Sequence, residues 1–145
     1  MIHRDGFEYK LHFEQGEIVG KLEKAPYSGK KTGSKFHWLP DLDVFTDIAV
    51  PAEYFMDVMK RQAVVNAGIT FRFRDQRGAS FETVDYLYEN GIQDYVAELS
   101  GEGSLTAPIF WEAERRGRDR EDKPEYKVKL SCARCFSNKT AVTEY

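Results

Sequence analysis

The sequence predicts a fold of the α+β class, because two segments with the 3.6-residue period of a helix lie among segments with the two-residue period of a strand. The clearest strand is FEYKLHFE at residues 7–14, and the clearest helix runs from Pro51 to Gly68. With 145 residues, of which 41% are hydrophobic and 14% aromatic, the chain is long enough to form a hydrophobic core.

The first third of the chain predicts an antiparallel β-ribbon. Residues 7–14 alternate between apolar and polar side chains, as expected for a strand with one face exposed to water. A turn at 15–17 leads to a short strand at 18–22, and a polar loop follows through residues 27–31. Phe36 and Trp38 then alternate with polar residues, which predicts the start of a further strand.

Residues 51–68 predict the first helix. Pro51 suits the first turn of a helix, where its missing N–H is not needed, and Gly68 suits the end. Both methionines of this segment are expected to fill the core. The residues at helical spacing are Phe55, Met59 and Ala63 together with Val58, Gln62 and Val65.

The middle of the chain predicts a strand pair followed by a second helix. In ITFRFRD (69–75) the apolar residues Ile69, Phe71 and Phe73 are expected to face a core, with Arg72 and Arg74 on the opposite face. Because the rings and the guanidinium groups diverge, this strand does not predict a nucleic-acid surface. A second strand is expected within residues 81–90. The helix within 91–100 is indicated by Ile92, Tyr95, Val96 and Leu99.

The last third predicts two strands, around Ile109 to Glu112 and Tyr126 to Phe136. The run that joins them, residues 113–125, carries charges of both signs as well as a glycine and a proline, so a solvated hairpin loop is expected. Cys132 and Cys135 form a lone C-x-x-C in the second strand. Positions three apart on a strand point to opposite faces, and ordinary packing is therefore favoured over a metal or redox site.

Composition excludes several classes of protein. The formal net charge of −3 and pI near 5.7 argue against a chain whose main task is non-specific nucleic-acid binding. No apolar run approaches the roughly 20 residues that span a bilayer, and the N-terminus lacks the apolar core of a signal peptide, so we expect no membrane partner and a cytoplasmic location.

Residue patterns alone do not indicate a catalytic site. The stretch KKTGSKF (30–36) lacks the spacing of a Walker phosphate loop, and strand-like residues follow its glycine where a helix would be required. Asp41 and Asp43 lie beside Pro40, which favours a turn-capping role over a carboxylate pair. No metal ligand set and no catalytic residue is therefore predicted.

The order of four motifs resembles the family of DNA gyrase B subunits, and more broadly the ATPase half of type IIA topoisomerases. These motifs are IHRDGFEYKLHFEQGE, TGSKFHWLPDLDVF, KRQAVVNAGITFRFRDQR and YENGIQDYVAEL, and together they cover most of the chain. Ser137 and Asn138 stand where the family has an Asn-Asp pair, so the sequence departs from the pattern there.

The resemblance implies that the chain is an internal fragment with two parts. Residues 1–87 would be the C-terminal part of a GHKL-type ATPase domain, an α/β sandwich. Residues 88–145 would be the N-terminal part of the transducer domain, which has a βαβ arrangement with a mixed sheet. The family's catalytic glutamate, magnesium-binding asparagine and adenine-reading aspartate would precede Met1, and its transducer lysine would follow Tyr145. The fragment alone would then be inactive and would carry no bound cofactor.

The resemblance also assigns four residues to the wall of a nucleotide pocket. Gly33 and Ser34 match a Gly-Thr pair that lines the adenine pocket, where the hydroxyl joins a water-mediated hydrogen bond to the base. Phe36 stands where the family has a β-branched aliphatic residue, and Arg4 matches an arginine that contacts aminocoumarin inhibitors. Ser34 has an equally acceptable interpretation as a local cap at a strand start.

In the intact enzyme the resemblance implies ATP and magnesium as cofactors. The implied partners are the A subunit of gyrase, a second copy of the B subunit, and duplex DNA, whose supercoiling would change by ATP-gated strand passage. Three alternatives remain open at this point: a fragment of the topoisomerase IV B subunit, a self-contained protein-interaction module without enzymatic activity, and a small nucleic-acid-binding domain, which the acidic balance disfavours.

Overall fold

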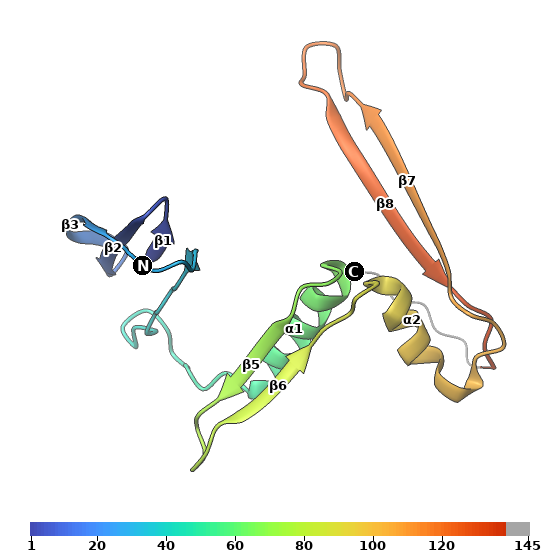
Figure 1. Cartoon of the computed structure of the whole chain (residues 1–145), viewed down its shortest axis with the longest axis horizontal. Helices are drawn as coiled ribbons and strands as arrows, with labels where there is room; N and C mark the ends of the chain where they lie inside the picture. Colours follow the sequence, from blue (N-terminus) through green and yellow to red (C-terminus); the bar gives the residue numbers. More distant parts are fainter. Residues whose placement is uncertain (139–145) are drawn as a thin grey trace. The chain divides into compact units, whose positions relative to one another are not determined.

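A computed structural model describes residues 1–138, and it confirms the α+β class. The chain divides into two compact units, Met1–Val50 and a second unit that begins at Pro51 (Figure 1). All strand pairs that the structure describes are antiparallel.

The first unit is a four-stranded sheet with the order β3-β2-β1-β4. Its strands are β1 (Ile2–Arg4), β2 (Phe7–Glu14), β3 (Glu17–Pro26) and β4 (Gly33–Ser34). Both tight hairpins turn on a pair of residues with positive φ that ends in glycine, Asp5-Gly6 and Gln15-Gly16. Such pairs match the twist of adjacent strands, so the predicted ribbon is confirmed, with β3 longer than predicted.

The predicted strand at residues 35–38 is wrong, and the register of the sheet explains why. Ser34 lies opposite Ile2, and the Lys35 and Met1 backbones exchange hydrogen bonds of 2.8 and 3.0 Å. The described ladder between β1 and β4 does not continue to Phe36. Within the described residues no strand pairs with 36–38, and an alternating pattern does not make a strand without a partner for its backbone groups.

The second unit starts with a helix packed on a two-stranded sheet. Helix α1 (Ala52–Val65) begins after Pro51 as predicted, and strands β5 (Phe71–Asp75) and β6 (Glu82–Tyr86) form a hairpin against it. The Phe55 and Phe73 rings stack with centroids 6.2 Å apart, which fixes the predicted apolar faces of α1 and β5 on each other. Val58, Val65 and Ile69 were also expected on these faces, but they lie exposed.

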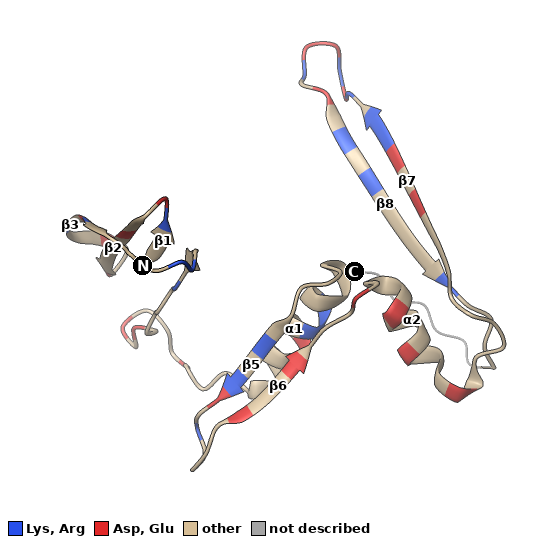
Figure 2. Ribbon diagram, viewed as in Figure 1, with Lys and Arg blue, Asp and Glu red and all other residues tan. Residues whose placement is uncertain are grey.

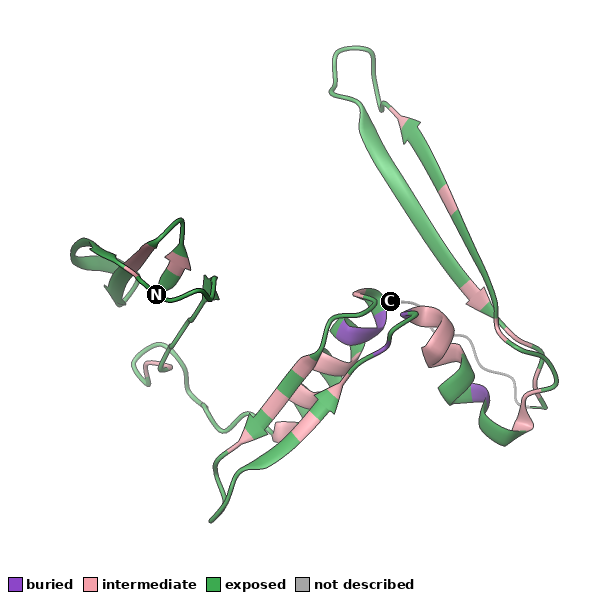
Figure 3. Cartoon of the chain, viewed as in Figure 1, coloured by how far each residue is buried: buried purple, intermediate pink, exposed green. Residues whose placement is uncertain are grey.

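The core of the second unit lies where α1, β6 and the next helix meet. Helix α2 (Ile92–Ser100) follows β6 and is continued by the 3₁₀ turn η1 (Gly101–Gly103). The buried hydrophobic residues among those described are Ala63, Val64 and Tyr88 (Figure 3). Partly buried side chains pack around them: Phe71, Tyr86, Ile92 and Tyr95.

The unit ends in a long hairpin formed by β7 (Ile109–Gly117) and β8 (Tyr126–Arg134). Residues 113–117, expected in the connecting loop, belong to β7, because their backbone continues the ladder with β8 as far as Gly117 and Tyr126. Charged side chains also pair across the two strands. Lys129 lies 2.9 Å from Glu112 and Lys127 lies 2.8 Å from Glu114, all on one face of the hairpin. The opposite face carries mainly apolar side chains, and all but half-buried Ala113 are exposed: Ile109, Trp111, Ala113, Tyr126, Val128, Leu130 and Cys132.

Gly91 sits at the start of α2 in a conformation that favours glycine. Its φ is +57°, and an added Cβ would lie 3.0 Å from the Val64 carbonyl oxygen and 3.2 Å from the Ala67 Cβ. Replacing Gly91 by alanine is therefore expected to lower the free energy of unfolding of this unit by about 1–2 kcal/mol, measured by urea titration. Gly78→Ala is the matched control, because the nearest atom to its added Cβ would be 3.9 Å away. Equal stability of the two variants would contradict the conclusion that the backbone conformation and close packing at Gly91 require glycine.

Candidate pocket wall and polar clusters

The predicted pocket-wall residues lie at one edge of the first unit. Gly33 and Ser34 make up β4, and they pair with His3 and Ile2 of β1. Because residues opposite each other in an antiparallel pair share a face, Ser34 shares one with Ile2 and, across β1, with Tyr9. The structure thus puts a hydroxyl beside apolar surface on the edge strand.

Arg4 and Phe36 differ in how firmly the structure places them. Arg4 ends β1 two residues after Ile2, hence on the same face, and its Nε lies 3.5 Å from an Asp5 carboxylate oxygen. Phe36 lies beyond β4 and is 83% exposed, so nothing in its own unit fixes its ring against Ser34. The structure therefore brings Arg4 and Ser34 onto one face but does not complete the predicted group with Phe36.

The opposite face of the sheet, behind Gly33, holds an ordered polar cluster. The His3 and Tyr27 rings stack with centroids 3.8 Å apart, and a His3 ring nitrogen lies 2.9 Å from a carboxylate oxygen of Glu8. The Lys10 ammonium lies 2.6 Å from the same carboxylate, and with the His3 contact it lowers the pKa of Glu8. The sequence did not predict this cluster, because His3 and Tyr27 are separated by strands β2 and β3 along the chain and meet only once the sheet has formed.

A second polar cluster links the two helices of the second unit. Glu98 accepts hydrogen bonds from the Lys60 ammonium at 2.7 Å and from the Tyr88 hydroxyl at 2.6 Å. Lys60 and then Tyr88 lower the pKa of Glu98, while burial together with this bond raises the pKa of Tyr88 to about 12. No local motif could have predicted a bridge between side chains 38 residues apart.

Basic residues of β5 lie beside acidic residues of β6 in the β5–β6 hairpin (Figure 2). Arg72 binds both carboxylate oxygens of Asp85, at 2.7 and 2.6 Å. Arg74 lies over the Phe81 ring at 4.2 Å. Both guanidinium groups therefore have contacts within the hairpin.

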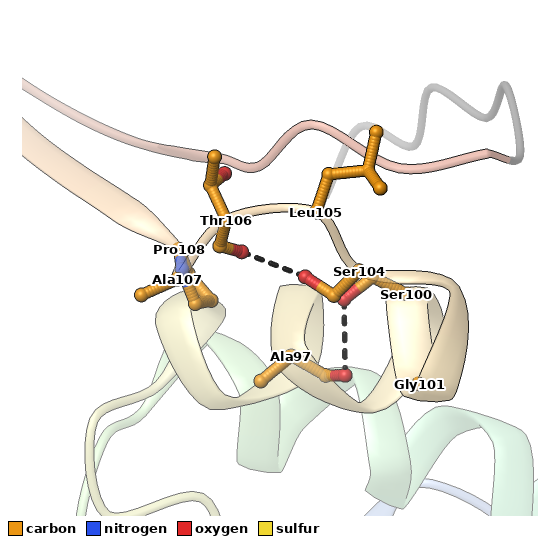
Figure 4. Close-up of a pocket in the computed structure, with 8 residues that line it drawn as sticks. All are labelled: Ala97, Ser100, Gly101, Ser104, Leu105, Thr106, Ala107 and Pro108. Carbon is orange, nitrogen blue, oxygen red and sulfur yellow. Dashed lines mark hydrogen bonds between the residues drawn. The ribbon is translucent and has the colours of Figure 1, made fainter.

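An open hollow of about 430 Å³ lies at the C-terminal end of α2 (Figure 4). Its hydroxyl groups are used locally: Ser104 donates to the Thr106 carbonyl at 2.7 Å, and Ser100 donates to the Val96 and Ala97 carbonyls. With small side chains and no ionised group in its lining, the hollow does not have the converging polar groups of a catalytic site.

The structure places two residue pairs for which the sequence left a catalytic or metal-binding role open. Asp41 accepts a hydrogen bond from the Asp43 amide at 2.9 Å, which is the turn-capping role expected for this pair. Cys132 and Cys135 are free thiols. Across residues 1–138 no group of three or more His, Cys, Asp and Glu side chains could hold a metal ion, and no helix is long and apolar enough to span a membrane.

The fold has a counterpart among solved structures. The chain matches the 43K ATPase domain of Thermus thermophilus gyrase B, determined in complex with an aminocoumarin, with a TM-score of 0.61 and 22% identity. The match covers 87% of this chain and 34% of that one. The chain therefore has the fold of part of a gyrase B ATPase domain, of the GHKL type.

Relatives in sequence define the family. The chain is 34% identical over 100 residues to the B subunit of DNA gyrase from Synechocystis and 31% identical over 120 residues to that from Chlamydia muridarum. It is 31% identical over 111 residues to the B subunit of DNA topoisomerase 4 from Enterococcus faecalis. These matches cover 68%, 81% and 76% of the chain, although no protein-family model matches it.

The chain belongs to the family of B subunits of DNA gyrase and DNA topoisomerase 4, which confirms the predicted resemblance. It spans only 9%, 15% and 16% of the length of these three relatives.

The raised pKa of Tyr88 can be tested directly. Subtracting the 295-nm absorbance titration of Tyr88→Phe from that of the wild type should leave one phenol that ionises near pH 12. Because the folded-state pKa lies above the ordinary value of 10, this phenol contributes stability fully below pH 10 and loses it as the pH rises through 12. A difference curve centred near pH 10 would show that the bond to Glu98 and the burial of Tyr88 are absent.

Proposed function

We propose that the chain is a working segment of the B subunit of an ATP-dependent type IIA DNA topoisomerase, an enzyme that changes DNA supercoiling by ATP-gated strand passage. The observation that carries the proposal is the extent of the match, 31% identity to a gyrase B subunit over 120 residues and 81% of the chain. The shared fold with a gyrase B ATPase domain supports it.

The segment's part in nucleotide binding is to supply pocket wall. The hydroxyl of Ser34 lies beside the apolar side chain of Ile2 on one sheet face, and a hydrogen-bonding group within apolar surface suits the edge and plane of a nucleobase. Arg4 ends the neighbouring strand on the same face, where an aminocoumarin or a nucleotide could meet its guanidinium. Phe36 would join this wall once other parts of the intact protein pack over its segment.

Residues 1–87 are proposed to complete the ATPase domain, and residues 88–145 to begin the transducer domain. By the resemblance to the family, the magnesium ligand and the groups that activate water would come from other segments of the intact protein. The isolated chain is accordingly expected not to hydrolyse ATP. A gyrase-type A subunit, a second copy of the B subunit, and duplex DNA are the proposed partners of the intact protein.

Gyrase and topoisomerase IV are equally compatible with this segment. The identities to two gyrase B subunits are 34% and 31%, and those to two topoisomerase 4 B subunits are both 31%. A supercoiling assay distinguishes them, because a gyrase introduces negative supercoils whereas topoisomerase IV relaxes and decatenates.

The intact polypeptide that contains this segment should hydrolyse ATP, and Ser34→Ala should raise its KM for ATP about 2- to 12-fold. This range corresponds to the roughly 0.5–1.5 kcal/mol of one net hydrogen bond. The kcat should change little, since contact with the base is the same in the ground state and the transition state. Steady-state ATPase kinetics provide the measurement.

Ser34→Thr should keep the wild-type KM, because it keeps the hydroxyl. Ser80→Ala is the matched control, since it removes a hydroxyl from an exposed loop of the second unit. An intact polypeptide without ATP-dependent activity would overturn the proposed function. Activity with an unchanged KM in Ser34→Ala would overturn only the assignment of Ser34 to the pocket wall.

A further inference from the structure

The short connection between β6 and α2 is held by several hydrogen bonds. The Tyr88 carbonyl oxygen accepts two backbone hydrogen bonds, from Gly68 after α1 at 2.9 Å and from Gly91 before α2 at 3.1 Å. Asp94 in the first turn of α2 reaches back to the Asn90 amide at 2.7 Å. The end of one helix and the start of the next are thus bonded to the same short segment.

Side chains attach the two helices to each other at a second place, about two turns away from the Tyr88 carbonyl on each helix. The Glu98 carboxylate on α2 joins the Lys60 ammonium on α1 to the Tyr88 hydroxyl, and one carboxylate oxygen serves each donor. The Tyr95 ring meets Tyr88 edge to face with centroids 5.8 Å apart, and the Lys60 ammonium lies 5.5 Å from its centre. Two separate points of attachment restrict the angle between two helices, whereas one would leave a hinge.

Helix α2 in turn holds the long hairpin. It packs beside β8, and Gln93 donates to the Pro108 carbonyl at 3.3 Å, immediately before β7 begins. The segment after η1 is fixed to the end of the hairpin, because Leu105 donates to the Phe136 carbonyl at 2.7 Å and Phe136 donates to the Thr106 hydroxyl at 3.0 Å. A change in the direction of α2 would therefore move the hairpin with it.

We propose that the bridge from Lys60 through Glu98 to Tyr88 is a locking device. It makes α1 with its β-hairpin and α2 with the β7–β8 arm move as one body. Removing the bridge leaves the backbone bonds of Tyr88 and the small core around its ring as a hinge, about which the arm swings. If residues 88–145 begin a transducer domain, the lock lies where motion would pass between the two domains; the lock itself does not depend on that assignment.

The test is the distance distribution between two spin labels, measured by double electron–electron resonance on the full chain. The labels are attached at Val58→Cys on α1 and Val128→Cys on β8, both at exposed positions, after Cys132 and Cys135 are replaced by serine. The chain with an intact bridge should give a single narrow distribution. Glu98→Ala should at least double its width.

Three further variants separate the lock from general destabilisation. Glu102→Ala removes an exposed carboxylate from the turn that follows α2 and should leave the width unchanged. Tyr88→Phe keeps the buried ring and loses only the hydroxyl, so it should broaden the distribution with the core retained. Lys60→Met combined with Glu98→Ala should be no broader than Glu98→Ala alone, because both changes remove one bridge.

A width in Glu98→Ala equal to that of Glu102→Ala would overturn the lock. If Glu98→Ala does not fold, as judged by its amide NMR spectrum, Tyr88→Phe decides in its place, and an unchanged width there overturns the proposal. The distance distributions are measured without ATP. A lack of ATPase activity in the intact polypeptide would therefore count against the proposed function but not against the lock.

Discussion

The packing of α1 against α2 in the second unit depends on Tyr88, because this residue contributes to the core and bonds the end of one helix to the start of the other. Its side chain is 8% exposed and fills the space between Ala63 and Val64 of α1 and the first turns of α2. Burying the ring requires a partner for its hydroxyl, and Glu98 provides one from a position that Lys60 can also reach. The backbone carbonyl of the same residue accepts hydrogen bonds from the amides of Gly68, after α1, and Gly91, before α2.

Outside this core, backbone pairing maintains the structure more than side-chain burial does. The first unit buries none of its side chains, and the β7–β8 hairpin leaves Trp111 54% exposed on its apolar face. Large apolar faces of this kind are normally covered by another element or by a partner. Membership of a family whose proteins are several times longer agrees with such cover, and it explains why the sequence pattern predicts half-buried strands where the structure shows exposed ones.

The sequence predicted which segments form helices and strands better than it predicted which of their faces are buried. Helix α1, strand β2 and helix α2 were correct because each carries a long periodic pattern with a suitable residue at its ends. The failures have two causes. Residues 36–38 have the pattern of a strand but no described strand to pair with, and residues 113–117 have the composition of a loop but form cross-strand ion pairs.

Among the candidate site residues, the resemblance assigned four to a pocket wall, whereas no sequence pattern predicted the polar clusters. Ser34 and Arg4 were assigned through resemblance, and the register of β1 with β4 places both on one face, although their roles remain predictions. The cluster of His3, Tyr27 and Glu8 behind Gly33 could not be predicted, since it requires the turn after β3 to be known.

The two departures from the family at the proposed pocket wall, Ser34 and Phe36, differ in their expected physical effect. Serine in place of threonine keeps the hydroxyl and loses one methyl group, worth about 0.8 kcal/mol of apolar contact when fully buried. It also relaxes the preference for an extended backbone that a β-branched residue supplies. In a strand of two residues held by pairing with β1, that preference matters little, because the pairing already sets the backbone. Phe36 matters more, since a ring adds volume and no described contact limits where it lies.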